Sequence, residues 1–189
     1  MYTKNIIPPT LPTPSNLYSS LQNNSHVRNS SISLLKEYTP IFESILSKNN
    51  ITFSPSNDFQ DVVEHIDYFI TLKNKVLSVD LKSNKNILHD NTSNPDYDWV
   101  WIELKNVQGK TGSIYGKANL IGFVYSNKVL LVGRLDLLKL FNSKCSNQLA
   151  PSKFDAAYKL YTRQGRLDLI SKVSITDIKN NCKCVTFFI

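Results

Sequence analysis

The sequence predicts an α+β domain. The first observation is the order of the predicted elements, because a helical stretch is followed by several strands and then by mixed elements. The second is that 41% of the 189 residues are hydrophobic, which is enough for a packed core. We therefore expect one domain over residues 31–189. Residues 1–30 are rich in Pro, Ser, Asn and Thr and are expected to form a flexible arm.

The first predicted element is a helix within residues 33–50, where apolar side chains recur at helical spacing. Pro40 interrupts this pattern. Thr39 is a suitable N-cap, so we expect a fresh helix with Pro40 in its first position and an end near Asn50. A short strand is expected at residues 51–54, followed by a polar loop.

Strands and turns dominate the rest of the chain. The expected strands are two that flank a tight turn at Lys73-Asn74, one over residues 99–107, two in a hairpin that turns at Ser126-Asn127, and a last one over residues 184–189. Short helices are expected at residues 135–141 and after Pro151, and a further hairpin turns at Gln164-Gly165.

Composition and charge restrict the partners. The net charge of +7 and the pI of about 9.3 favour an anionic partner, with nucleic acid ahead of a membrane surface. The odd number of cysteines, three, suits free thiols better than disulfides. No apolar run is long enough for a membrane span, and no signal-peptide pattern is present. We expect a soluble, intracellular protein in the cytoplasm of a host cell.

Two aspartates stand out in the hairpin around Lys73-Asn74. With these two residues at the turn, paired positions sum to 147, so Asp67 faces Asp80. Side chains in such a pair have Cβ atoms about 4.5–5.5 Å apart. Two carboxylates that close repel each other, and either a proton or a cation relieves the repulsion.

The chemistry that this pair suits is metal-assisted hydrolysis. Mg²⁺ or Mn²⁺ binds carboxylate oxygens and keeps several waters. Lys82 lies two residues after Asp80, hence on the same face of the strand. The hypothesis from the residues alone is that Asp67 and Asp80 hold the metal and that Lys82 acts on a water or a phosphate. A harmless exposed hairpin face is the alternative.

The order of these motifs resembles the PD-(D/E)xK nuclease superfamily, which includes restriction endonucleases. The segments that carry the resemblance are "EHIDYFI", "VDLK", "WVWIELKNVQGKTGSIYGKANLIGF" and "YTRQGRLDLIS". Together they are similar to small uncharacterised phage-encoded members, over roughly residues 40–178. The resemblance implies a restriction-endonuclease-like core, a central mixed β-sheet flanked by helices, and metal-dependent DNA cleavage.

The resemblance also implies roles for single residues. Asp67 and Asp80 match the two acidic positions, Lys82 the lysine, and Glu43 the helical glutamate, with Glu64 as an alternative acid. Asn119 stands where relatives are expected to have an acid, which motivates the alternative of a non-catalytic DNA-binding or virion-associated protein. A nuclease that processes RNA is a remoter option. DNA and a divalent metal are the expected partners, and a homodimer is left open.

Other residues carry competing interpretations. Glu103 and Lys105 form a second acid-x-Lys pattern, which is either the true motif or a neighbouring charge. His65 faces Lys82 in the predicted register and is either a substrate contact or a structural residue. Lys159, Arg163 and Arg166 form a basic cluster that suits DNA-backbone contacts, a solvated hairpin tip being the alternative.

Overall fold

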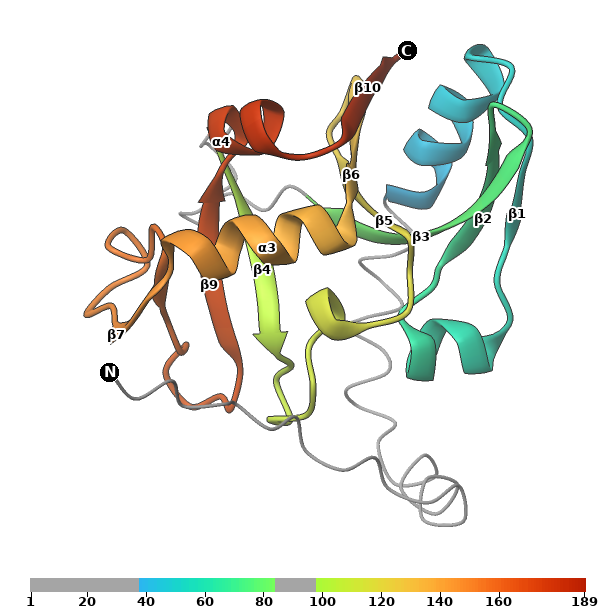
Figure 1. Ribbon diagram of the computed structural model, residues 1–189. Coiled ribbons are helices and arrows are strands. Elements are labelled where there is room, and N and C mark those ends of the chain that lie inside the picture. Colours follow the sequence, from blue (N-terminus) through green and yellow to red (C-terminus); the bar gives the residue numbers. More distant parts are fainter. Residues whose placement is uncertain (1–37, 84–97) are drawn as a thin grey trace. The chain divides into compact units, whose positions relative to one another are not determined.

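A mixed sheet organises the residues that the computed structural model describes, 38–83 and 98–189. Six strands form it in the order β1-β2-β3-β5-β6-β10 (Figure 1). They are β1 (Phe53–Pro55), β2 (Tyr68–Leu72), β3 (Lys75–Ser83), β5 (Leu120–Val124), β6 (Lys128–Gly133) and β10 (Cys184–Phe188). Neighbours run antiparallel except β3 and β5, which are parallel. The predicted α+β class with a mixed central sheet is confirmed, whereas the expected arm at residues 1–30 lies outside the described residues.

The remaining elements pack on this sheet or beside it. They are a helix at residues 38–48, η1 (Gln60–Glu64), β4 (Trp99–Lys105), η2 (Ser113–Tyr115), α3 (Arg134–Lys144), β7 (Ser146–Leu149), β8 (Lys159–Leu160), β9 (Leu169–Ser174) and α4 (Ile175–Asn181). β4 pairs with β9 and β7 pairs with β8, each pair separate from the central sheet. Within the described ranges, no helix has the length and apolar character that crossing a membrane requires.

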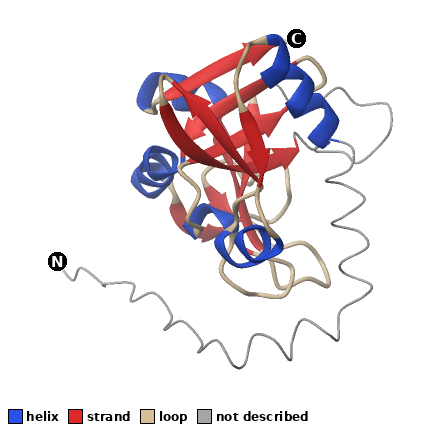
Figure 2. Cartoon of the chain, turned by 90° about the vertical axis from the view of Figure 1, so that its right-hand side faces the viewer, coloured by secondary structure: helices blue, strands red, loops and turns tan. Residues whose placement is uncertain are grey.

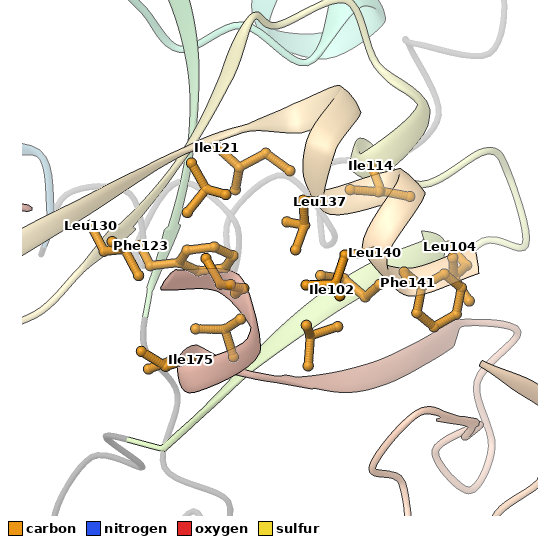
Figure 3. Close-up of a cluster of buried hydrophobic side chains, with 14 of the residues drawn as sticks. Ile102, Leu104, Ile114, Ile121, Phe123, Leu130, Leu137, Leu140, Phe141 and Ile175 are labelled. Carbon is orange, nitrogen blue, oxygen red and sulfur yellow. The ribbon is translucent and has the colours of Figure 1, made fainter. Parts of the chain in front are cut away.

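The central sheet carries apolar side chains on both faces. Side chains alternate between the faces along each strand, so a single strand contributes to two clusters. On β5, Ile121 and Phe123 belong to a cluster with β4, α3 and α4, which Figure 3 shows. Val124 belongs instead to a second cluster, with Phe42 and Ile45 of the helix at residues 38–48. Helices accordingly lie on both sides of the strands (Figure 2).

The same alternation assigns a face to the charged residues of β3. Val79 and Leu81 belong to the cluster under the helix at residues 38–48. Asp80 pairs with Ile121 in the parallel ladder. Asp80 and Lys82 therefore point to the opposite face, toward β4 and η2. This confirms the prediction that the two side chains share one face of the strand.

The hairpin of β2 and β3 confirms the predicted turn. Leu72 pairs with Lys75 and Tyr68 with Val79, so the ladder keeps the sum of 147. Lys73 and Asn74 have φ values of 49° and 61°, which is the conformation of the two central residues of a type I′ turn. This turn twists in the same sense as the strands and so keeps them in register.

Three local predictions are wrong. Residues 38 and 39 are already helical, so Thr39 is not an N-cap, and Tyr38 packs against the core from within the helix. The polar loop after β1 contains η1. No helix lies between Pro151 and β8, because the chain there leads directly into that strand, which pairs with β7.

Candidate functional site

Asp80 and Lys82 form an ion pair at the edge of the core. Lys82 Nζ lies 2.6 Å from Asp80 Oδ1, and the two side chains are 31% and 3% exposed. Asp80 Oδ2 is buried and has no hydrogen-bond partner among the described residues. Burial raises the pKa of Asp80, although Lys82 and the nearby Ser113 hydroxyl favour the charged form. Such an oxygen costs about 1–3 kcal/mol unless a donor or a cation reaches it.

Lys82 remains charged in this setting. Burial alone would lower the pKa of Lys82, but the negative charges of Asp80 and Asp67 outweigh burial and raise it. A protonated lysine has three N–H donors, and the ion pair with Asp80 uses one of them. The ammonium can therefore contact a further anion at the partly exposed end of the pair.

Asp67 lies one residue before β2, where the regular ladder ends. Its N–H donates to Val79 O at 2.8 Å, although the ladder pairs Val79 with Tyr68. Its Oδ2 accepts from the N–H of Leu81 at 2.5 Å. The predicted direct facing of Asp67 and Asp80 is therefore wrong in detail, because an extra residue at the strand end redirects the side chain. The two carboxylates still interact, since Asp80 raises the pKa of Asp67.

Asp61 is a site residue that the sequence did not indicate. Its carboxyl group lies within hydrogen-bonding reach of Asp67. Burial and, secondly, the charge of Asp67 together raise the pKa of Asp61 to about 6. Burial also raises the pKa of Asp67 to about 6, against the opposing effect of Lys82. Near pH 6 two such groups hold a proton between them unless a cation replaces it.

The segment η1 brings Asp61 to this position. Asn57 and Gln60 cap each other, with the Gln60 N–H 2.9 Å from Asn57 Oδ1 and the Asn57 N–H 3.1 Å from Gln60 Oε1. The segment ends at His65, whose φ of 56° is in the left-handed region. The Asn-x-x-Gln spacing resembles a capping box. It is the sequence signal that could have predicted a helical turn here.

His65 and Glu103 complete the charged surroundings. Burial lowers the pKa of His65, and the charge of Lys82 lowers it further, so the imidazole is neutral at pH 7. The nearby Thr111 backbone opposes this shift. Glu103 on β4 lines a small hollow together with Lys82 and Ser113. We name the whole group the carboxylate site; its members are Asp61, His65, Asp67, Asp80, Lys82 and Glu103.

Two predicted acids have partners elsewhere. Glu43 Oε1 accepts from Tyr68 Oη at 2.6 Å, and so joins the helix at residues 38–48 to β2. Glu64 forms an ion pair of 2.8 Å with Lys117. Lys105, the alternative lysine, is exposed at the end of β4. The structure thus brings Glu103 to the carboxylate site and leaves the charges of Glu43 and Glu64 engaged by other residues.

The predicted basic cluster does not act as one unit. Arg163 forms an ion pair with Asp168, which is 1% exposed, and its N–H also donates to Asp168 Oδ1 at 3.2 Å. Lys159 is half-buried in β8, whereas Arg166 is exposed in the hairpin that turns at Gln164-Gly165. Arg166 is therefore the member whose charge is presented to solvent.

The residues of the carboxylate site fit a magnesium or manganese ion. No ready-made group of three or more His, Cys, Asp or Glu ligands occurs in the part of the chain that the structure describes. Mg²⁺ does not require one, since it often binds one or two carboxylates and keeps its waters. The unpartnered Asp80 Oδ2 and the proton-sharing pair Asp61 and Asp67 are the oxygens that such an ion would take.

Comparison of the chain with protein-family models, with curated proteins and with solved structures finds no match.

Proposed function

We propose that the protein is a metal-dependent DNA endonuclease that hydrolyses phosphodiester bonds at the carboxylate site. The observation that carries the proposal is the buried, unpartnered Oδ2 of Asp80, which lies in a group of carboxylates beside a charged lysine. Buried charge of one sign requires compensation, and a hard divalent cation suits oxygen ligands. The net charge of +7 supports an anionic substrate.

The order of the elements also supports the proposal. A helix at residues 38–48 precedes β1, Asp67 directly precedes β2, and Asp80 and Lys82 lie on β3 of a mixed sheet. This order agrees with the one that the superfamily resemblance implies.

The roles of the residues follow from their contacts. Asp67 and Asp80 would hold the ion, with Asp61 as a further oxygen donor. A bound ion would polarise a phosphate and favour ionisation of a water. Lys82, already charged and one-third exposed, would donate hydrogen bonds to a phosphate oxygen or orient the attacking water. The Leu81 N–H keeps the Asp67 carboxylate oriented.

The test is cleavage of a supercoiled plasmid in Mg²⁺, in Mn²⁺ and in EDTA. Lys82→Ala should abolish metal-dependent cleavage, because it removes the ammonium that contacts Asp80. Lys105→Ala makes the same substitution at the exposed lysine of the competing motif, and at saturating DNA it should keep metal-dependent cleavage. Lys179→Ala is the matched control at an exposed lysine of α4, and it should cleave like the wild type.

Two results would contradict the proposal in different ways. If Lys105→Ala is inactive and Lys82→Ala is active, the motif of Glu103 and Lys105 takes over the assigned role. If the wild type binds DNA and cleaves neither DNA nor RNA in any metal, the protein is a non-catalytic DNA-binding protein. Cleavage of RNA alone would reassign the substrate.

A further inference from the structure

Two turns lie side by side at one end of the β4–β9 pair (Figure 1). One comprises residues 105–111 and the other residues 162–167. The Leu167 N–H donates to Val107 O at 3.4 Å, and a methyl group added at Gly109 would lie 3.3 Å from Leu167 Cβ. The two turns therefore form one continuous surface, which we name the twin-turn surface.

The twin-turn surface is positively charged. Lys105, Lys110 and Arg166 are exposed on it, and neither turn contains an aspartate or a glutamate. Arg163 does not add to this charge, because the buried Asp168 neutralises it. The surface thus carries cations that no carboxylate of the same turns compensates.

Both turns are held by internal hydrogen bonds. Asn106 Oδ1 accepts from the N–H groups of Gln108 and Lys110, each at 3.0 Å. In the second turn the Arg166 N–H donates to Arg163 O at 3.1 Å, and the ion pair of Arg163 with Asp168 ties that turn to the core. Cations on a preorganised backbone lose less entropy on binding than cations on a mobile loop.

The first turn also adjoins the carboxylate site. Lys105 pairs with Thr111 at the base of the turn, and the Thr111 backbone lies near the His65 ring. A polyanion lying on the twin-turn surface would therefore extend toward Asp80 and Lys82. This placement is what a phosphodiester substrate requires.

We propose that the twin-turn surface binds the phosphate backbone of duplex DNA and delivers one strand to the carboxylate site; the delivery rests on the proposed function, and the binding does not. Sites for single strands use aromatic side chains on which bases stack. Residues 105–111 and 162–167 contain no aromatic residue. Lysine and arginine on a platform without such stacking groups suit phosphate contacts to a duplex.

The test is fluorescence anisotropy of the full chain with a labelled duplex of about 20 base pairs, in EDTA and at about 50–300 mM salt. The variant Lys110→Ala/Arg166→Ala removes one cation from each turn. It should flatten the slope of log K against log salt by about 1.8 and weaken binding by tens of fold in about 0.1 M salt. Circular dichroism should show an unchanged fold, because both side chains are exposed.

Two matched variants sharpen the test. Lys139→Ala/Lys179→Ala makes the same charge change at exposed positions of α3 and α4, and should leave the slope nearly unchanged. Lys110→Arg/Arg166→Lys keeps both charges and should bind like the wild type. The proposal is overturned if the two alanine variants flatten the slope of log K against log salt equally. It is also overturned if the wild type does not bind the duplex or binds a single strand more tightly.

Binding in EDTA separates this result from the proposed function. Weaker binding by Lys110→Ala/Arg166→Ala supports DNA binding by the twin-turn surface, even if the protein cleaves DNA in no metal. Equal binding by Lys110→Ala/Arg166→Ala and the wild type overturns DNA binding by the twin-turn surface, even if Lys82→Ala abolishes cleavage.

Discussion

Asp80 combines burial, charge and an unpartnered oxygen in one side chain. Lys82 compensates Oδ1, but Oδ2 has no partner in the described chain. Burial raises the pKa of Asp80 in spite of that ion pair, so the charged form costs more in the folded protein than in water. The stability cost at this residue suits a ligand site better than a purely structural role.

In EDTA, Asp80→Asn should have a stability within about 1 kcal/mol of the wild type, because it removes a buried charge but also the ion-pair partner of Lys82. Metal should separate the two proteins. An ion at 100 times its dissociation constant stabilises the wild type by about 2.7 kcal/mol and the variant by much less. Thermal melting with EDTA and with Mg²⁺ or Mn²⁺ measures both effects.

Asp155→Asn is the control, since it makes the same change at an exposed carboxylate. It should melt like the wild type with and without metal. Equal metal-induced shifts in the wild type and in Asp80→Asn would show that Asp80 holds no ion.

At the scale of elements, the β2–β3 hairpin carries strain in its turn. Both Lys73 and Asn74 have positive φ, which costs a lysine more than an asparagine or a glycine. The strands nevertheless hold the register, because Tyr68 and Ile70 are buried on one face and a slip by one residue would expose them. Packing therefore imposes a conformation that the turn residues do not favour by themselves.

Lys73→Asn/Asn74→Gly should stabilise the protein by about 1 kcal/mol, because Asn-Gly is the preferred pair for this turn. Urea denaturation measures the change in the free energy of unfolding. Asn127→Gly is the matched control in the β5–β6 turn, where Asn127 does not have a positive φ. Glycine should destabilise there, by a few tenths of a kcal/mol to about 1 kcal/mol. The same sign at both turns would contradict the assigned backbone conformation.

At the scale of the whole molecule, the carboxylate site couples stability to pH. The pKa values of Asp61 and Asp67 rise from 3.8 in the unfolded chain to about 6 in the folded protein. Between these values the folded protein binds more protons than the unfolded chain, so stability falls as the pH rises. Above about pH 6 the full cost of the charged pair is present.

In EDTA, the free energy of unfolding of the wild type should decrease from pH 5 to pH 7 relative to that of Asp61→Asn/Asp67→Asn. One extra bound proton corresponds to about 1.4 kcal/mol per pH unit. His65 acts in the opposite direction, because burial lowers its pKa, and loss of the Asp61 charge in the variant removes an effect that raises it. Urea denaturation at each pH measures the difference, and parallel curves would contradict the raised pKa values.

Local rules account for what could be predicted from the sequence. The alternation of side chains places Asp80 and Lys82 on one face of β3, and the two-residue turn sets the ladder from Tyr68 to Val79. Both depend on residues a few positions apart, so period and turn chemistry suffice. The mixed α+β class followed in the same way from the order of helical and strand patterns.

Contacts between distant residues decided the rest. η1 brings Asp61 close to Asp67. β4 pairs with β9 and not with β3, and from there it contributes Glu103 to the carboxylate site. The buried Asp168 holds the charge of Arg163 in an ion pair. The sequence by itself determined which side chains share a strand face; only the tertiary structure decided which charges meet, because burial and pairing depend on packing between segments far apart in the chain.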